Sequence, residues 1–393
     1  MKRISHRVSR TLLPALMLVI LLPLGSGNAA WGGPREQAKR LHDRIAGVPP
    51  GAAVLDSMAA DIMAGRAEDA AFTAMEHSAF YNVTLKHFVT PWTNEEQTAF
   101  APLNDYTATV IGMVRDEVPF NTLLSADILY VGDPGLGLPP YSTGNNDHYE
   151  ALESQGHDLK TALVRTTQSA VTGLPAAATA GVMTTRAAAR AFFVAGTNRA
   201  MFRFTLLNHL CTDLEQIKDN TRPTDRIRQD VSRSPGGDSR IFLNSCAGCH
   251  SGMDPMAQAF AYYDYDEDAG RLIYTPGTVR PKYLINADNF KYGYVTPDDR
   301  WDNYWRSGPN ALLGWDGGLP GSGSGAKSLG MELENSEAFA RCQVQKVFRA
   351  MCLREPGNSA DRNQIDVITA AFKTSNYNLK QVFAKTAVYC MGD

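Results

Sequence analysis

The sequence predicts a mostly α-helical protein, built of helical subdomains that are joined by long irregular loops and include at most a few short strands. Small and apolar residues recur at spacings of three and four near both ends of the chain, which is the period of an amphipathic helix. Runs of Val, Ile and Thr, which are typical of strands, are scarce. The 33 glycines and 21 prolines gather in the middle of the chain, where they indicate loops between helical blocks.

The first 30 residues have the pattern of a secretory signal peptide. A basic start that includes Lys2 and Arg3 precedes an apolar run at 12–24, and small residues follow at 25–30. The apolar run is shorter than the roughly 20 residues of a spanning helix, which leaves an uncleaved membrane anchor as the alternative. We therefore expect residues 1–30 to be removed from an exported, periplasmic protein that keeps no transmembrane anchor.

An N-terminal helical region is expected over residues 31–140. Residues 36–101 show helical periodicity, and a further helical pair is expected over 104–129. Pro119 interrupts this pair, because proline cannot donate the helical hydrogen bond. Closely spaced turn residues over 132–158 predict a loop where this region ends.

The central region, residues 141–330, is expected to contain long loops. Helical periodicity returns over 184–217. Residues 260–310 are rich in Tyr, Asp, Gly and Pro, with one candidate strand at 271–274. The glycine-rich residues 314–330 predict a flexible loop.

The C-terminal region, residues 331–393, predicts a compact antiparallel unit of three helices. Pro356-Gly357 and residues 376–378 separate the three helical patterns. The helices are expected at residues 336–351, 359–373 and 379–388.

One motif carries recognisable chemistry, Cys246-Ala247-Gly248-Cys249-His250. Two cysteines three positions apart can form thioethers with the two vinyl groups of haem, and the histidine that follows can bind the iron from one side. Export strengthens this interpretation, because bacteria attach c-type haem outside the cytoplasm. The sequence predicts one covalently bound haem c, attached through Cys246 and Cys249 with His250 as the proximal iron ligand, in a segment that the helical subdomains surround.

The motif has three alternative interpretations. A zinc ribbon would need a second Cys-x-x-Cys or a histidine pair at ligand spacing, and the sequence has neither. A thioredoxin-like redox pair would need a strand before the motif and a helix after it, whereas Asp254-Pro255 is expected to end the helix early. A structural disulfide between Cys246 and Cys249 is the third alternative.

The other four cysteines, an even number in an exported protein, predict two disulfides. Cys342 and Cys352 lie on one predicted helix about 15 Å apart, which is too far for them to bridge each other. An up-down-up arrangement of the C-terminal helices brings Cys352 near Cys390, which leaves Cys211 to pair with Cys342. The alternative is that all four are buried free thiols.

The sixth ligand of the haem iron has to be inferred indirectly. Met331 is the first candidate, because it follows the flexible glycine-rich segment and opens a helical block. The alternative is that Met331 is a core residue of that helix. Met253 and Met256 lie too close in sequence to His250 to reach the opposite face of the haem. The further candidates, each with the alternative of a partly buried or surface histidine, are His209 and His87.

The residues around the motif resemble a known family. The segment from Cys246 to Pro255, followed by Ala259-Phe260 and Tyr263-Asp264, is similar to the large planctomycete-type cytochrome C proteins. In that family a tripartite array of uncharacterised domains surrounds a Cys-x-x-Cys-His-x-x-x-Asp-Pro segment. Less specific similarities lie at residues 115–126, 180–185, 198–207, 336–361 and 379–388.

The resemblance implies haem binding through the cysteine motif and a turn formed by Asp254 and Pro255. This sequence departs from many relatives at Gln258, in its short N-terminal part and in having a single haem motif. The family is functionally obscure, so the resemblance implies haem binding more than it implies any particular reaction.

Electron transfer is the leading expectation for the function. A single-haem c-type cytochrome would exchange electrons with a redox partner protein by outer-sphere transfer, without a bound substrate. The first alternative is a haem enzyme, a peroxidase or an oxidoreductase acting on a small molecule, with His209 or Arg341 beside the iron. The second is a haem-bearing protein whose aromatic segment 262–294 docks a partner. The 38 basic and 41 acidic residues form no basic stripe, which argues against nucleic acid as a partner.

Overall fold

The computed structural model describes residues 32–193, 197–232, 238–285 and 293–392, and the predicted signal peptide lies outside them. Helices make up most of the described chain, and the strands occur only as three short antiparallel pairs. The prediction of a mostly α protein with a few short strands is confirmed. Within the described ranges, no helix has the length and apolar character needed to cross a membrane.

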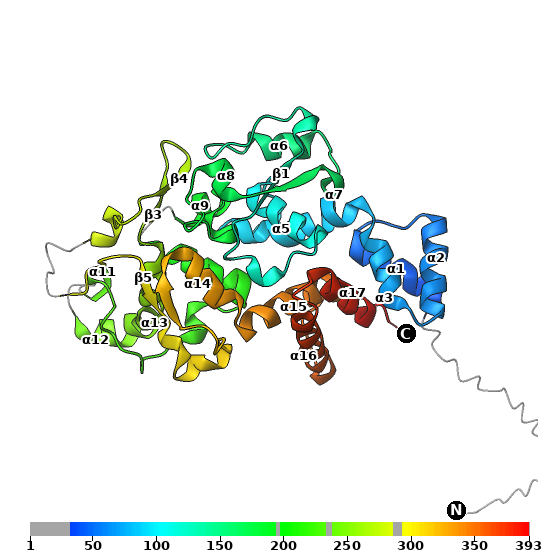
Figure 1. The fold of residues 1–393 in the computed structure, drawn as a ribbon. Helices are drawn as coiled ribbons and strands as arrows, with labels where there is room; N and C mark the ends of the chain where they lie inside the picture. The colour runs from blue at the N-terminus through cyan, green and yellow to red at the C-terminus, as the bar shows by residue number, and fades with distance from the viewer. Residues whose placement is uncertain (1–31, 194–196, 233–237, 286–292, 393) are drawn as a thin grey trace, which may run out of the picture.

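The N-terminal helices form a bundle with the last helix of the chain. They are α1 (Pro34–Ala46), α2 (Ala52–Met63) and α3 (Ala67–Met75), and α17 (Leu379–Cys390) packs against α1 and α3 (Figure 1). The Arg44 guanidinium of α1 donates hydrogen bonds to the carbonyl oxygens of Met351 and Cys390, at 2.8 and 3.0 Å. The first and last helices of the described chain therefore belong to one packing unit.

The next part of the chain is built around α5 (Asp105–Arg115), which is buried along nearly its whole length. Asn104 caps this helix by accepting a hydrogen bond from the backbone N–H of Thr107. The strand pair β1 (Leu129–Gly132) and β2 (Leu163–Thr166) lies against it, and the aromatic ring of Tyr130 occupies the space that a side chain at Gly112 would need. The helices around this centre are η1 (Phe80–Leu85), α4 (Lys86–Val89), α6 (Asp147–Ser154), α7 (Leu159–Ala162), α8 (Gln168–Thr172) and α9 (Arg186–Phe192).

The cysteine motif belongs to a separate group of short helices. It consists of α10 (Arg199–Thr205), η6 (Leu206–Leu210), η7 (Leu214–Ile217), α11 (Gln229–Ser232), α12 (Ser239–Ile241), η8 (Phe242–Cys246) and α13 (Ala247–Ala257). Two hairpin-like strand pairs follow it, β3 (Tyr263–Asp266) with β4 (Arg271–Tyr274) and β5 (Arg300–Asp302) with β6 (Ser322–Ser324). The candidate strand at 271–274 is thus confirmed. Figure 1 shows α11, α12 and α13 on the opposite side of the molecule from α1, α2 and α3.

Two segments expected to be loops contain helices. Residues 147–154 form α6, whose Tyr149 and Leu152 are buried, and residues 325–334 form α14 (Gly325–Glu334). The prediction of a flexible loop over 314–330 is therefore wrong for its second half, and the expected region boundary at 330 falls inside a helix. The reason is packing: Gly330 lies directly against the backbone carbonyl of Leu124, where a side chain would collide. Tertiary contact outweighs the low helix propensity of glycine there.

The three C-terminal helices agree with the prediction within two residues at each end. They are α15 (Glu337–Cys352), α16 (Ser359–Thr374) and α17. Ser336, Asn358 and Asn378 cap them by accepting hydrogen bonds from backbone N–H groups in the first turns. The caps explain why the sequence marks the helix starts so clearly.

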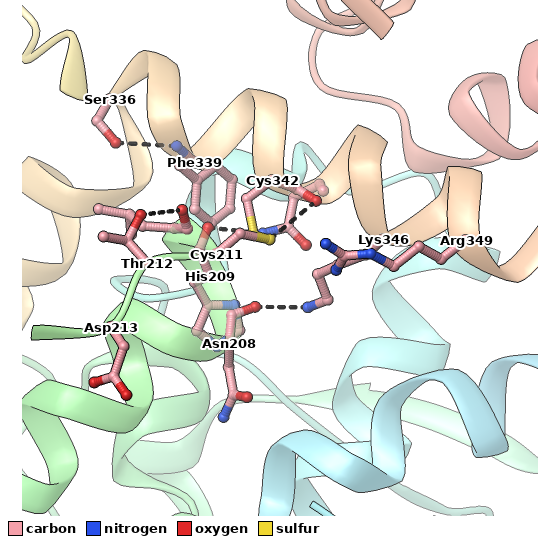
Figure 2. Close-up of a disulfide and its surroundings, with 12 residues drawn as sticks. Asn208, His209, Cys211, Thr212, Asp213, Ser336, Phe339, Cys342, Lys346 and Arg349 are labelled. Atoms are coloured by element: carbon pink, nitrogen blue, oxygen red, sulfur yellow. Dashed lines mark hydrogen bonds between the residues drawn. A yellow bond between two sulfur atoms is a disulfide. The ribbon is translucent and has the colours of Figure 1, made fainter. Parts of the chain in front are cut away.

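Both predicted disulfides are present. Cys352 pairs with Cys390, which joins the end of α15 to the end of α17, and Cys211 pairs with Cys342 (Figure 2). The Cα atoms are 5.3 Å apart in each pair. The alternative of four free thiols is therefore wrong.

Candidate functional site

The three residues of the predicted haem-attachment motif lie at one helix start. Cys246 is the last residue of η8, and Cys249 and His250 lie in the first turn of α13. All three are partly exposed, and the two cysteines are free thiols in a chain whose other four cysteines are paired. The alternative of a structural disulfide between Cys246 and Cys249 is not what the structure has.

Two glycines allow neighbouring residues to pack closely against the first half of α13. A side chain at Gly248 would come within 2.6 Å of the Asn220 side-chain oxygen, and one at Gly252 would collide with the indole of Trp305. The backbone N–H of Asp219 donates to the Gly248 carbonyl at 2.9 Å. The helix is therefore held closely on these sides, while the Cys249 and His250 side chains stay accessible.

The expected turn at Asp254 and Pro255 is wrong. Both residues lie inside α13, which continues to Ala257. A proline inside a helix removes one hydrogen bond at a cost of about 3 kcal/mol, but Met253, Met256 and Ala257 are buried and their packing favours the helix. The segment before the motif is the π-helical turn η8 and not the strand that the thioredoxin-like alternative requires.

The Asp254 carboxylate is the centre of the site. One of its oxygens lies 3.0 Å from Nδ1 of His250. Arg199 donates two hydrogen bonds to it, from Nε at 2.8 Å and from Nη2 at 3.0 Å, and Nη2 of Arg228 lies 3.6 Å away. Burial acts to raise the pKa of Asp254, but the positive charges of Arg228 and Arg199 outweigh it and hold that pKa well below its usual range. Asp254 is therefore an anion.

An anionic Asp254 fixes the tautomer of His250. A carboxylate only accepts hydrogen bonds, so Nδ1 of His250 must carry the proton that is shared between them. The other ring nitrogen, Nε2, then keeps its lone pair and is available as a metal ligand. A carboxylate behind the distal nitrogen of a ligating histidine is the arrangement that orients metal-binding imidazoles in many proteins.

Further contacts hold the side chains of Arg199 and Arg228 in place. Arg199 makes a second ion pair with Asp230, at 2.6 Å, and the guanidinium of Arg228 lies 4.9 Å above the ring of Tyr283. Arg228 is almost completely buried. Arg199 begins α10, Asp230 lies in α11, and Arg228 directly precedes α11. The sequence does not indicate these residues, because no local spacing links them to the motif.

The surroundings of the motif fit haem. Cys246 packs with a small group of buried apolar residues, Ile227, Val231 and Ala247, that is separate from the main core. Ile241 and Leu243, which precede the motif, are 42% and 55% exposed. Two free thiols, an imidazole whose Nε2 keeps its lone pair, and exposed apolar side chains close in sequence are the groups that a flat, largely apolar macrocycle with two vinyl groups requires.

Most candidates for the sixth ligand lie elsewhere. Met331 is in the second half of α14, with its side chain 43% exposed, and α14 packs mainly against β6 and the short helix η9 (Gln258–Phe260). Met253 and Met256 are buried on α13 itself, and His87 is exposed on α4. The role of Met331 as sixth ligand stays a prediction.

His209 occupies a closed aromatic site. Its Nε2 lies 2.7 Å from the hydroxyl of Tyr106, and its ring packs against Trp92 and Phe339. Burial is the main reason why the pKa of His209 is well below its usual value. Figure 2 shows it beside the Cys211–Cys342 disulfide, where it serves as a core residue.

Among the residues that the structure describes, no group of three or more His, Cys, Asp or Glu side chains is arranged as a metal site. The chain matches no protein-family model, and no curated protein and no solved structure shows significant similarity to it. The chemistry of the site therefore has to be argued from its own residues.

Proposed function

We propose that this protein is an exported, single-haem c-type cytochrome that transfers electrons to or from a redox partner protein. The observation that carries the proposal is the hydrogen-bonded pair of His250 and the anionic Asp254, which follows the two free cysteines in the sequence. The two disulfides support a location outside the cytoplasm, because disulfides persist in oxidising compartments. The resemblance to the planctomycete-type cytochrome C family stays part of this proposal.

Each residue of the site has a distinct role in it. Cys246 and Cys249 hold the haem through thioethers, and Nε2 of His250 is the proximal ligand. Asp254 keeps the imidazole in one tautomer and one orientation, and Arg199 and Arg228 keep Asp254 charged. Haem bound there supplies the reversible one-electron chemistry of its iron.

Electron transfer is favoured over the enzyme alternative by the positions of the two residues considered for a reactive site. His209 is enclosed by Tyr106, Trp92 and Phe339, and Arg341 forms an ion pair with Asp366 on the C-terminal helices. The aromatic segment of the docking alternative, 262–294, lies partly outside the described residues. No observation on the described part of it favours docking over electron transfer.

The test is to produce the protein in a host with a c-haem maturation system and to weigh the denatured chain by mass spectrometry. We expect one haem that stays attached under denaturing conditions. Changing Cys246→Ser together with Cys249→Ser is expected to abolish attachment. The double change Cys352→Ser with Cys390→Ser removes two cysteines far from the motif and is expected to keep the haem. A wild-type chain without covalent haem would refute the proposal.

A further inference from the structure

A cavity of about 310 Å³ lies between the end of α8, the strand β4 and the loop that contains Tyr141 and Thr143. Its walls are mixed: Leu272 and the ring of Tyr274 supply apolar surface, and threonine and tyrosine hydroxyls supply hydrogen-bonding groups. A partly apolar cavity with a few polar groups is the usual form of a small-molecule site, and this volume is at the lower end of that range.

Part of the cavity wall is formed by a buried arginine, Arg186. Its side chain is almost fully buried at the start of α9, and its Nη2 donates a hydrogen bond to the Asn146 side-chain oxygen at 2.6 Å. Its Nε–H has no hydrogen-bond acceptor among the described residues. A buried guanidinium without an anionic partner is costly, so such groups are normally paired.

No carboxylate of the described residues forms an ion pair with Arg186. The nearby Asp105 is buried, but its oxygens accept hydrogen bonds from the backbone N–H groups of Arg186 and Ala187, at 2.6 and 3.0 Å. Asp105 therefore fixes the start of α9 and is not a partner for the guanidinium. Among the described residues, the Nε–H group of Arg186 therefore has neither an acceptor nor a nearby counter-charge paired with it.

The charge of the cavity wall favours an anion. Arg271, which is exposed on β4, is a second cation in the wall, and no Asp or Glu lines this cavity. Two neighbouring cavities also reach Arg186, but Glu150 lines both of them. Glu150 would repel an anion on those sides. The wall that holds Arg271 contains no acidic side chain, and the carboxylate that an anion would meet there is the buried Asp105 beside Tyr141.

We propose that this cavity binds a small organic carboxylate, with its carboxylate group on Arg186 and Arg271 and its apolar part against Leu272 and Tyr274. A guanidinium offers two parallel N–H donors to the two oxygens of a carboxylate, which makes arginine the preferred residue for such recognition. The apolar half of the wall distinguishes an organic acid from inorganic phosphate. The proposal goes beyond electron transfer and is independent of haem attachment.

The test is isothermal titration of the full protein with benzoate and, separately, with inorganic phosphate. We expect saturable binding of benzoate and at least about tenfold weaker binding of phosphate. Arg186→Met keeps the length of the side chain without its charge and is expected to weaken benzoate binding at least about tenfold.

Arg190→Met is the matched control, because Arg190 lies one turn further along α9 and lines only the neighbouring cavities. It is expected to leave benzoate binding unchanged. Arg186→Met removes a buried group and can lower stability, so Leu174→Trp, which fills the cavity and keeps both arginines, is the second variant and is expected to abolish binding. Absence of benzoate binding in the wild type, equal binding in Leu174→Trp, or a preference for phosphate would each overturn the proposal.

Discussion

Nδ1 of His250 lies 3.0 Å from a carboxylate oxygen of Asp254, one helical turn further along α13. The carboxylate is completely buried and is held by Arg199 and Arg228, so its position and its charge are both fixed. A proximal histidine with such a partner gains electron density, and this stabilises the more highly charged oxidation state of an iron that it binds.

Replacing this carboxylate should change the reduction potential of the proposed haem. Asp254→Asn removes the negative charge behind the imidazole, so we expect the potential to rise by some tens of millivolts. We also expect a loss of stability of about 3 kcal/mol, because Arg199 and Arg228 lose a buried counter-charge. A spectroscopic redox titration measures the first effect, and urea unfolding measures the second.

Asp230→Asn is the control for this prediction. Asp230 contacts Arg199 in the same network but has no hydrogen bond to His250. We expect it to lower stability while leaving the potential nearly unchanged. Equal shifts in potential for the two variants would show that Asp254 acts through the overall charge and not through His250.

The sequence predicts the part of this site that is local. The motif is contiguous, and the spacing of four between His250 and Asp254 places both on one helix face once α13 is recognised as a helix. The sequence does not predict that α13 continues through Asp254, because Pro255 follows it and a proline normally ends a helix. Arg199 lies 55 residues from Asp254 and Arg228 lies 26 residues from it, and no sequence pattern encodes contacts at such separations.

The same difference between local signals and long-range contacts explains which helices the sequence predicts. The helices α15, α16 and α17 were predicted closely, because periodicity and capping residues are both local signals. The sequence does not predict α14, because its glycines disfavour a helix and the packing that stabilises it, such as Gly330 against the backbone of Leu124, is a long-range contact. The turn-rich composition of residues 132–158 likewise predicts a loop, whereas buried Tyr149 and Leu152 stabilise the helix α6 there.

The two disulfides should contribute unequally to stability. They close loops of different length, with 131 residues separating Cys211 from Cys342 and 38 separating Cys352 from Cys390. Loop-closure entropy predicts losses of about 5 and about 4 kcal/mol when each pair is replaced by alanine. Urea unfolding of the two double variants measures this difference. A larger loss for Cys352→Ala with Cys390→Ala would show that strain or residual structure outweighs loop length.

The two glycines that face the neighbours of α13 should respond differently to alanine. At Gly252 the added methyl group meets the buried indole of Trp305, which packing holds in place, so we expect a loss of about 1–3 kcal/mol. At Gly248 it meets the end of the Asn220 side chain, which can move, so we expect a smaller loss. Thermal unfolding compares Gly252→Ala with Gly248→Ala, and equal losses would contradict the assigned role of Trp305.

Glu334 should make stability depend on pH. Its carboxyl group is buried and accepts hydrogen bonds from the backbone N–H of Leu124 and the hydroxyl of Ser125. Burial outweighs these hydrogen bonds and raises the pKa of Glu334 from 4.5 to about 8. Between these values the folded chain binds one proton more than the unfolded chain. Its contribution to stability is therefore fully present below pH 4.5 and is lost as the pH rises to about 8, at up to about 1.4 kcal/mol per pH unit.

The variant Glu334→Gln isolates this effect. Glutamine is neutral at every pH and keeps an oxygen that can accept one of the two hydrogen bonds. We expect the stability of the wild type relative to the variant to fall steadily as the pH rises through this window, because only the wild type must bury a charge or bind a proton. Urea unfolding at several pH values measures the difference. A difference that is constant with pH would mean that Glu334 has the same pKa in the folded and unfolded chains.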